Sequence, residues 1–286
     1  FRRVLFRSME LFKLKNKPAP AQLDGHIIIV TGAGSGIGRG VALELGKRGA
    51  HVVLADIEEK GLLEVEKEFA DNKCNPPLLV LGDQSKEADV QATVTKTIKH
   101  FGGLDGAVIN AGIGISDKLE DLDVEKWRRG LDINLTSAFM LTKEAMKVMR
   151  KQKMGGSIVY IASKNAFAPG AGFGGYSVSK AGMLQLMRIA SLEGGNAGIR
   201  FNGINPDAVF DNSKLWEGGI REQRAAAHGV KPEELEDFYA SRNLLNARVR
   251  SLDVARAAAF FLSDESSRTT GSVIAVDGGV AAAFPR

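Results

Sequence analysis

The sequence predicts an α/β fold: a single doubly wound (Rossmann-type) domain with a seven-stranded parallel sheet flanked by helices. Three observations lead to this prediction. Seven short apolar runs alternate with helix-length segments, and a glycine-rich turn follows the first run directly. With 286 residues, 44% of them hydrophobic, the chain is also long enough to bury one large core.

The predicted strands are short β-rich runs, at residues 26–31, 51–56, 77–82, 106–110, 157–162, 199–204 and 272–278. The segments of helix length between them are 36–49, 58–71, 86–101, 124–152, 175–194 and 252–263. Apolar strands separated by helices are typical of a parallel sheet that is covered on both faces.

One segment, about 211–250, departs from this alternation and predicts two or three inserted helices. Lys231-Pro232-Glu233-Glu234 within it has the signature of a helix start, with Pro and acidic residues in the first turn. An insertion after the sixth strand lies at the edge where doubly wound sheets bind ligands.

The N-terminal residues and the composition limit which classes of protein remain. Residues 1–8 (FRRVLFRS) resemble a translated sequencing adapter, so we treat them as a non-native tail; 9–22 are expected to be a linker and 23–286 the domain. Three of the basic residues behind the net charge of +4 lie in that tail, and no basic block with aromatics suggests nucleic acid. No stretch predicts a membrane span or a secretory signal, which favours a cytoplasmic protein.

Metal and thiol sites are also not expected. The single cysteine, Cys74, is interpreted as a surface-loop residue beside two prolines; a nucleophilic role stays formally open. The four histidines, His26, His51, His100 and His228, are scattered, so no metal site is predicted.

The first strand leads into Thr31-Gly32-Ala33-Gly34-Ser35-Gly36-Ile37-Gly38, which opens a predicted helix. Glycines let backbone amides approach a pyrophosphate, and the helix N-terminus favours negative charge. Asp56 ends the next strand, where a carboxylate can accept both ribose hydroxyls of an adenosine and repel a 2′-phosphate. Arg39 is the counter-argument, because a cation there can pair with such a phosphate. The pattern predicts a dinucleotide site that prefers NAD.

Ser163, Tyr176 and Lys180 form the candidate catalytic set. Tyr176 and Lys180 are four residues apart at the start of a predicted helix and therefore share a face. An ammonium near the phenol is expected to lower its pKa, so that Tyr176 acts as a general base or acid near neutral pH. Ser163, after the preceding strand, can hold the substrate oxygen. Taken singly, each residue fits a helix-surface or turn role; together, after a dinucleotide turn, they predict catalysis.

These motifs resemble the short-chain dehydrogenase/reductase family over roughly residues 23–286. The resemblance implies a catalytic tetrad of Asn134, Ser163, Tyr176 and Lys180, in which Asn134 kinks its helix and holds a water against the lysine. It also implies that NAD lies against Gly32, Ser35, Gly36, Ile37, Gly38, Asp56, Ile57, Asp83, Gln84, Asn110, Ala111, Gly112, Tyr176, Lys180, Pro206 and Val209.

The sequence departs from the family after the sixth strand, where Pro206 is followed by Asp207 rather than Gly, and Asp211 stands near the usual Thr. The segment NPDAV, the insertion and the ending VDGGVAAAFPR resemble one subgroup, the dehydrogenase half of bifunctional rhamnulose-1-phosphate aldolase/lactaldehyde dehydrogenases. This resemblance implies oxidation of lactaldehyde to lactate in rhamnose breakdown, and an aldolase half fused upstream of this chain.

Aldehyde oxidation without a nearby cysteine requires the aldehyde hydrate, which is chemically an alcohol. Asp207 or Asp211 could then bind its second hydroxyl; the alternative is that Asp207 is an ordinary solvent-facing turn residue. Two other functions stay open: a secondary-alcohol, polyol or 3-oxoacyl dehydrogenase/reductase, and a non-catalytic dinucleotide-sensing protein. The partners expected are a small-molecule substrate and copies of the same chain, with a homotetramer implied by the family.

Overall fold

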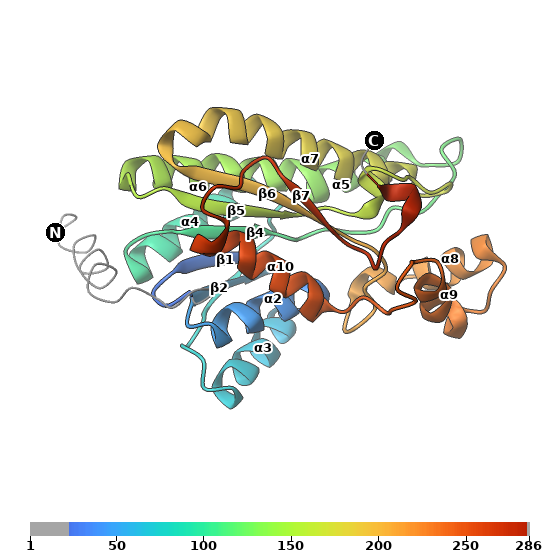
Figure 1. Ribbon diagram of the computed structural model, residues 1–286, viewed down its shortest axis with the longest axis horizontal. Helices are drawn as coiled ribbons and strands as arrows, with labels where there is room; N and C mark the ends of the chain where they lie inside the picture. The colour runs from blue at the N-terminus through green and yellow to red at the C-terminus, as the bar shows by residue number, and fades with distance from the viewer. Residues whose placement is uncertain (1–22, 285–286) are drawn as a thin grey trace.

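The structure, a computed structural model, describes residues 23–284 and contains the predicted seven-stranded parallel sheet (Figure 1). The strand order is β3-β2-β1-β4-β5-β6-β7. The strands are β1 (Ile27–Thr31), β2 (His51–Asp56), β3 (Leu78–Leu81), β4 (Gly106–Ile109), β5 (Gly156–Ile161), β6 (Ile199–Pro206) and β7 (Val273–Val276). The order reverses at β1, where Ile28 pairs with Val52 of β2 on one side and with Gly106 of β4 on the other. Such a reversal is where doubly wound sheets form a ligand crevice.

Helices cover both faces of the sheet (Figure 1). One face carries α2 (Gly36–Lys47), α3 (Glu59–Asp71) and α10 (Ser251–Leu262); the other carries α4 (Glu87–Phe101), α5 (Val124–Leu131), α6 (Ser137–Gln152) and α7 (Gly174–Gly194). Neighbouring residues of β1 serve different faces: Ile28 packs in the core with Val41 of α2, and Ile29 in the core with Leu141 of α6. Burial on both faces explains why the strands are continuously apolar.

The predicted helix 124–152 is interrupted. A π-helical turn, Asp132–Thr136, separates α5 from α6, so the single predicted helix is corrected to three consecutive segments. Such π turns inside helices are rare and are found mostly at functional sites.

The insertion contains α8 (Ile220–His228) and α9 (Leu235–Ser241), with short 3₁₀ turns at Lys214–Trp216 and Pro232–Glu234. The helix start predicted at 231–234 is present, because the Glu234 carboxylate accepts a hydrogen bond of 3.1 Å from the backbone N–H of Lys231. The insertion has its own small apolar cluster around Ala225, Leu235 and Tyr239, and it projects from the sheet beyond the end of β6 (Figure 1).

Further 3₁₀ turns are Lys164–Ala166, Gly195–Ala197, Asp264–Ser266 and Ala281–Ala283. Within residues 23–284 no helix has the length and apolar character needed to cross a bilayer, and no cluster of three His, Cys, Asp or Glu side chains is arranged to bind a metal ion. Cys74 is half-buried, and burial raises the pKa of its thiol. The predicted tail at 1–8 and the linker at 9–22 lie outside the described residues.

Candidate active site

A cavity of about 650 Å³ extends along the carboxyl ends of the strands. This volume is within the usual range for small-molecule and cofactor sites. Most of the residues expected to contact a dinucleotide line it: Gly32, Ser35, Gly36, Ile37, Asp56, Ile57, Asp83, Gln84, Asn110, Ala111, Gly112, Tyr176, Lys180, Pro206 and Val209. Gly38 and Asn134 do not line the cavity, and each has a structural role described below.

The glycine-rich turn needs its glycines for two reasons. Gly32 and Gly36 have φ values of +64° and +50°, in the left-handed region that disfavours side chains. Gly38 instead lies where α2 packs on the turn, because a Cβ there would be 2.0 Å from the Gly32 carbonyl oxygen and 2.5 Å from Nδ2 of Asn110. Gly38 therefore has a packing role in this turn, and its expected contact with the cofactor stays a prediction.

One end of the cavity fits an adenosine. Asp56 ends β2, and its carboxylate accepts hydrogen bonds from the backbone N–H groups of Gly34 at 2.9 Å and Glu58 at 3.0 Å. The side-chain oxygen of Gln84 is buried and has no hydrogen-bond partner among the described residues, so this wall offers an acceptor to a ligand amine. The guanidinium of Arg39 pairs with Glu68 of α3 instead of facing Asp56.

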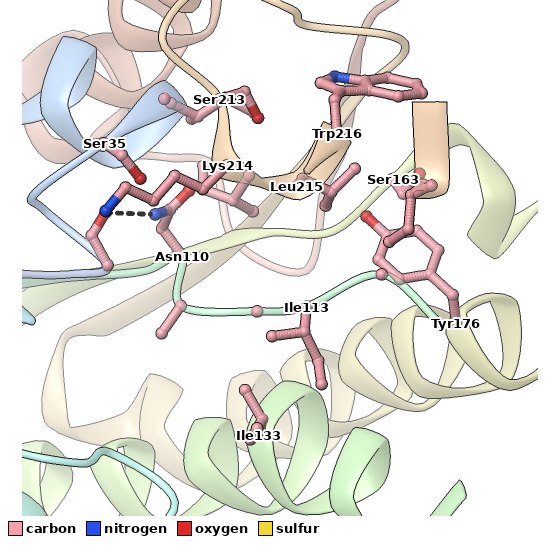
Figure 2. A pocket seen from close by; sticks show the side chains of 18 of the residues that line it. Ser35, Asn110, Ile113, Ile133, Ser163, Tyr176, Ser213, Lys214, Leu215 and Trp216 are labelled. Carbon is pink, nitrogen blue, oxygen red and sulfur yellow. Dashed lines mark hydrogen bonds between the residues drawn. The ribbon is translucent and has the colours of Figure 1, made fainter. Parts of the chain in front are cut away.

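The other end holds Ser163, Tyr176 and Lys180. Ser163 follows β5, and its hydroxyl accepts a hydrogen bond of 3.2 Å from the backbone N–H of Asn165. Tyr176 and Lys180 lie one turn apart on α7 and are 7% and 3% exposed. Figure 2 shows Tyr176 and Ser163 together on one side of the cavity, with Leu215 and Trp216 of the insertion beside them.

The pKa of Tyr176 differs from the sequence-based expectation. Burial raises the pKa of Tyr176 to about 12; the Ser163 side chain acts in the opposite direction, and the charge of Asp207 adds to the rise. Burial also lowers the pKa of Lys180 to about 8. The Lys180 ammonium donates to the Ile161 carbonyl at 2.8 Å and lies 5.7 Å from the centre of the Tyr176 ring. The expected lowering of the Tyr176 pKa is therefore wrong for the protein without cofactor, because desolvation dominates.

Asn134 lies behind the cavity wall, in the π turn, and is fully buried. Its Oδ1 accepts from the N–H of Ile113 at 2.8 Å, and its Nδ2 donates to the Ile113 carbonyl at 3.0 Å and to Oγ of Ser179 at 3.0 Å. Ser179 in turn donates to the Tyr176 carbonyl at 2.7 Å. Asn134 thus connects the wall segment at Ile113 to the catalytic helix.

The two acids after β6 are held by other groups of the protein, and their hydrogen bond to a substrate hydroxyl stays a prediction. Asp207 is 8% exposed, so it is not a solvent-facing turn residue; it is also absent from the cavity wall, and its carboxylate pairs with Arg242 at 3.1 Å. The Asp211 carboxylate accepts hydrogen bonds from the backbone N–H of Ser251, at 3.0 Å, and from the Ser251 hydroxyl, at the start of α10. Asp211 is therefore a structural tie between the insertion and α10.

Several wall residues were not predicted individually. Leu215, Trp216, Gln223 and Arg224 come from the insertion, and Lys164 follows Ser163 directly. The position of the insertion after β6 did indicate ligand contact, but which of its side chains turn inward depends on its own packing. The proximity of Lys164 to Ser163 in sequence was the one local signal.

Comparisons with known proteins agree with this geometry. A family model described as enoyl-(acyl carrier protein) reductase matches residues 32–281. The chain is 37% identical over 284 residues to YuxG, an uncharacterised oxidoreductase of Bacillus subtilis; the match covers 99% of this chain and 41% of YuxG. The chain thus spans less than half the length of that relative.

Other relatives match over nearly their whole length. Levodione reductase of Leifsonia aquatica is 30% identical over 261 residues, which cover 91% of this chain and 95% of that protein. A crystal structure of levodione reductase superposes with a TM-score of 0.85 at 29% identity, covering 92% of this chain and all of that one. An actinorhodin polyketide ketoreductase solved with NADPH has a TM-score of 0.84 at 28% identity and covers 89% of this chain and 97% of that one.

Proposed function

Because this chain belongs to the short-chain dehydrogenase/reductase family, we propose that it is an NAD-dependent dehydrogenase that oxidises a small hydroxy-aldehyde, L-lactaldehyde, to L-lactate. The family membership makes it an NAD(P)-dependent oxidoreductase of small substrates. The observation that carries the proposal is the convergence of Ser163, Tyr176 and Lys180 at one end of a cavity whose other end fits an adenosine.

The chain's own residues have distinct tasks in this proposal. The glycine-rich turn and Asp56 hold the cofactor, and Ser163 positions the substrate oxygen by a hydrogen bond. Tyr176 takes the proton from the substrate hydroxyl, and the nearby ammonium of Lys180 favours the phenolate that forms. When bound, the oxidised cofactor supplies the hydride acceptor and a positive charge beside Tyr176.

The preference for NAD rests on charge at the adenosine end. Asp56 and Glu58 both line the cavity there; Glu58 pairs with Lys214, so the carboxylate of Asp56 is the negative charge that a 2′-phosphate would meet. Arg39 does not offset Asp56, because it pairs with Glu68.

The choice of lactaldehyde rests on the resemblance of the NPDAV segment, the insertion and the C-terminal sequence to the lactaldehyde dehydrogenase subgroup. The reacting species would be the hydrate of the aldehyde, which Tyr176 can deprotonate like any alcohol. We also propose that the natural protein has an aldolase half upstream; the partial coverage of YuxG supports this. The homotetramer, the cytoplasmic location and the role in rhamnose breakdown stay predictions.

The test is NADH formation from NAD and L-lactaldehyde, with lactate assayed as the product and 1,2-propanediol run in parallel. Lactate and NADH should appear in equal amounts, and Tyr176→Phe should abolish both because it lacks the phenolic proton acceptor. NADH from the diol but not from lactaldehyde would contradict the aldehyde assignment.

A secondary alcohol or ketone is the second candidate substrate. The match to levodione reductase over nearly the whole length of both chains favours it, since that relative is a reductase by name. The propanediol arm of the assay separates it from the aldehyde reaction.

A further inference from the structure

Two cationic side chains line the cavity at its substrate end, and neither is part of the catalytic set. Lys164 follows Ser163 and is half-buried; its ammonium donates to the Ala168 carbonyl at 3.2 Å. Arg224 projects from α8, is 8% exposed, and donates to the Ala171 carbonyl at 3.1 Å. Its guanidinium also lies at hydrogen-bond distance, 3.1 Å, from Nε2 of His228. Within residues 23–284 neither Lys164 nor Arg224 has a carboxylate at ion-pair distance, so neither charge is neutralised by a direct ion pair.

Their positions relative to Tyr176 follow from ring contacts and chain connectivity. The guanidinium of Arg224 lies 5.4 Å from the centre of the Phe173 ring, and that ring centre is 4.6 Å from the centre of the Tyr176 ring. Lys164 is covalently adjacent to Ser163. Arg224 is thus connected to Tyr176 through Phe173, Lys164 is connected to Ser163 through the backbone, and both cations line the same cavity.

The surrounding charges leave this region positive. Besides Lys164 and Arg224, the charged groups near it are Arg242, Asp207 and Asp277, which makes three cations against two carboxylates. Asp207 is engaged by Arg242, and Asp277 accepts from the N–H of Gly279 at 2.8 Å; neither carboxylate lines the cavity. Lys164 and Arg224 therefore line the cavity, whereas the two carboxylates and Arg242 do not.

The neighbouring histidine responds to the same field. The pKa of His228 is lowered to about 4, first by burial and then by the charges of Arg224, Arg242 and Lys164. Burial lowers the pKa of the Lys164 ammonium, and the negative charge of Asp207 counters this by raising it. An acid after β6 thus helps to keep a cavity cation charged without meeting the ligand itself.

We propose that Lys164 and Arg224 form an anion subsite next to Ser163 and Tyr176 that binds a small carboxylate. This inference rests on the proposed function and narrows its substrate class. The carboxylate has two sources: it forms at the reacting carbon, as in lactate made from lactaldehyde, or it is already present in a hydroxy-acid substrate. In either case the subsite distinguishes a ligand that carries an anion from a neutral alcohol of the same size.

The direct measurement is calorimetric titration of the NADH-saturated full chain with L-lactate and with lactamide, its neutral counterpart. Charge-assisted hydrogen bonds contribute about 1.5–3 kcal/mol, which predicts that lactate binds at least about tenfold more tightly than lactamide. Lys164→Gln and Arg224→Gln should each reduce this preference several-fold. Lys231→Gln, an exposed cation of the same insertion, is the matched control for the loss of one charge and should keep the preference.

Equal binding of lactate and lactamide to the wild-type chain would overturn the subsite. So would an unchanged preference in both cavity variants, whose folding is verified by their NADH affinity and circular dichroism. If Arg224→Gln does not fold, Lys164→Gln decides alone.

Turnover assays separate the two sources and isolate the proposed function. NADH formed from lactaldehyde, with lactate preferred over lactamide, supports a carboxylate made at the reacting carbon. NADH formed from 3-hydroxybutyrate supports a carboxylate brought by the substrate. A lactate preference without turnover of any substrate supports the subsite and contradicts the proposed function. Turnover of lactaldehyde without a lactate preference supports the proposed function and contradicts the subsite.

Discussion

Replacing Asn134 by Ala tests the connection between the cavity wall and the catalytic helix. The substitution removes the acceptor of the Ile113 N–H and the donor to the Ile113 carbonyl; Asn134 is buried and Ile113 is half-buried. A buried group that loses its partner costs about 1–3 kcal/mol, and the half-burial of Ile113 places each loss at the lower end, so the variant should lose roughly 2–4 kcal/mol of unfolding free energy. Ser179 contributes less to this loss, because it keeps its hydrogen bond to the Tyr176 carbonyl.

Thermal melting without cofactor measures this loss, and the expected fall in Tm is roughly 5–10 °C for a chain of this size. Asn72→Ala is the control: its side chain is exposed and makes one hydrogen bond, to the Glu68 carbonyl at 2.8 Å, so its Tm should barely change. The kcat of Asn134→Ala should also fall, because Ile113 and Tyr176 lose their shared support. If the two variants melt at the same temperature, the buried hydrogen bonds of Asn134 do not have the stabilising role assigned to them.

Three further outcomes are expected. Asp56→Asn removes a negative charge at the adenosine end, so the ratio of kcat/KM for NADP to that for NAD should rise about tenfold or more; an unchanged ratio in steady-state kinetics would show that another group selects the cofactor. Gly38→Ala places a Cβ 2.0 Å from the Gly32 carbonyl oxygen, and the forced shift should lower stability by about 1–3 kcal/mol in melting experiments and weaken NAD binding; a normal Tm and normal affinity would contradict the close packing. The His228 pKa is lowered from 6.5 to about 4, so the unfolded chain takes up its proton first and stability is lost as the pH falls from 6.5 towards 4. His228→Gln should therefore flatten the stability profile in that window, and an equally steep profile would show that other groups cause the loss.

Much of the fold was predictable because it depends on local patterns. Continuously apolar strands, glycine at the first turn and helix-length crossovers are sufficient for a doubly wound sheet, and the seven parallel strands confirm that prediction. The π turn at 132–136 was not predictable from helix propensities, because Asp-Ile-Asn-Leu-Thr has no helix-breaking residue; only the family resemblance indicated a kink at Asn134. What selects the π turn is tertiary: the buried side chain of Asn134 reaches the backbone of Ile113.

The candidate site was also only partly predictable, because some of its properties depend on tertiary contacts. Ser163, Tyr176 and Lys180 were found because their spacing on β5 and α7 is local. The Tyr176 pKa was expected to fall, since the sequence displays the neighbouring Lys180 but not the degree of burial that raises it. The partner of Asp207 is Arg242, 35 residues away in the insertion, and no local pattern predicts a contact across that distance.

The insertion connects the two ends of the cavity physically. Its first segment lies on the glycine-rich turn, where the Asn212 carbonyl accepts the N–H of Gly36 at 2.7 Å and Lys214 pairs with Glu58. Three residues further on, Leu215 and Trp216 stand beside Ser163 and Tyr176 (Figure 2). A cofactor phosphate that accepted the N–H of Gly36 would take the place of the Asn212 carbonyl, and Leu215 and Trp216 would move with this short segment. The shape of the substrate end would then depend on whether the turn is occupied, so the same substitutions in 211–216 should alter cofactor affinity and substrate choice together.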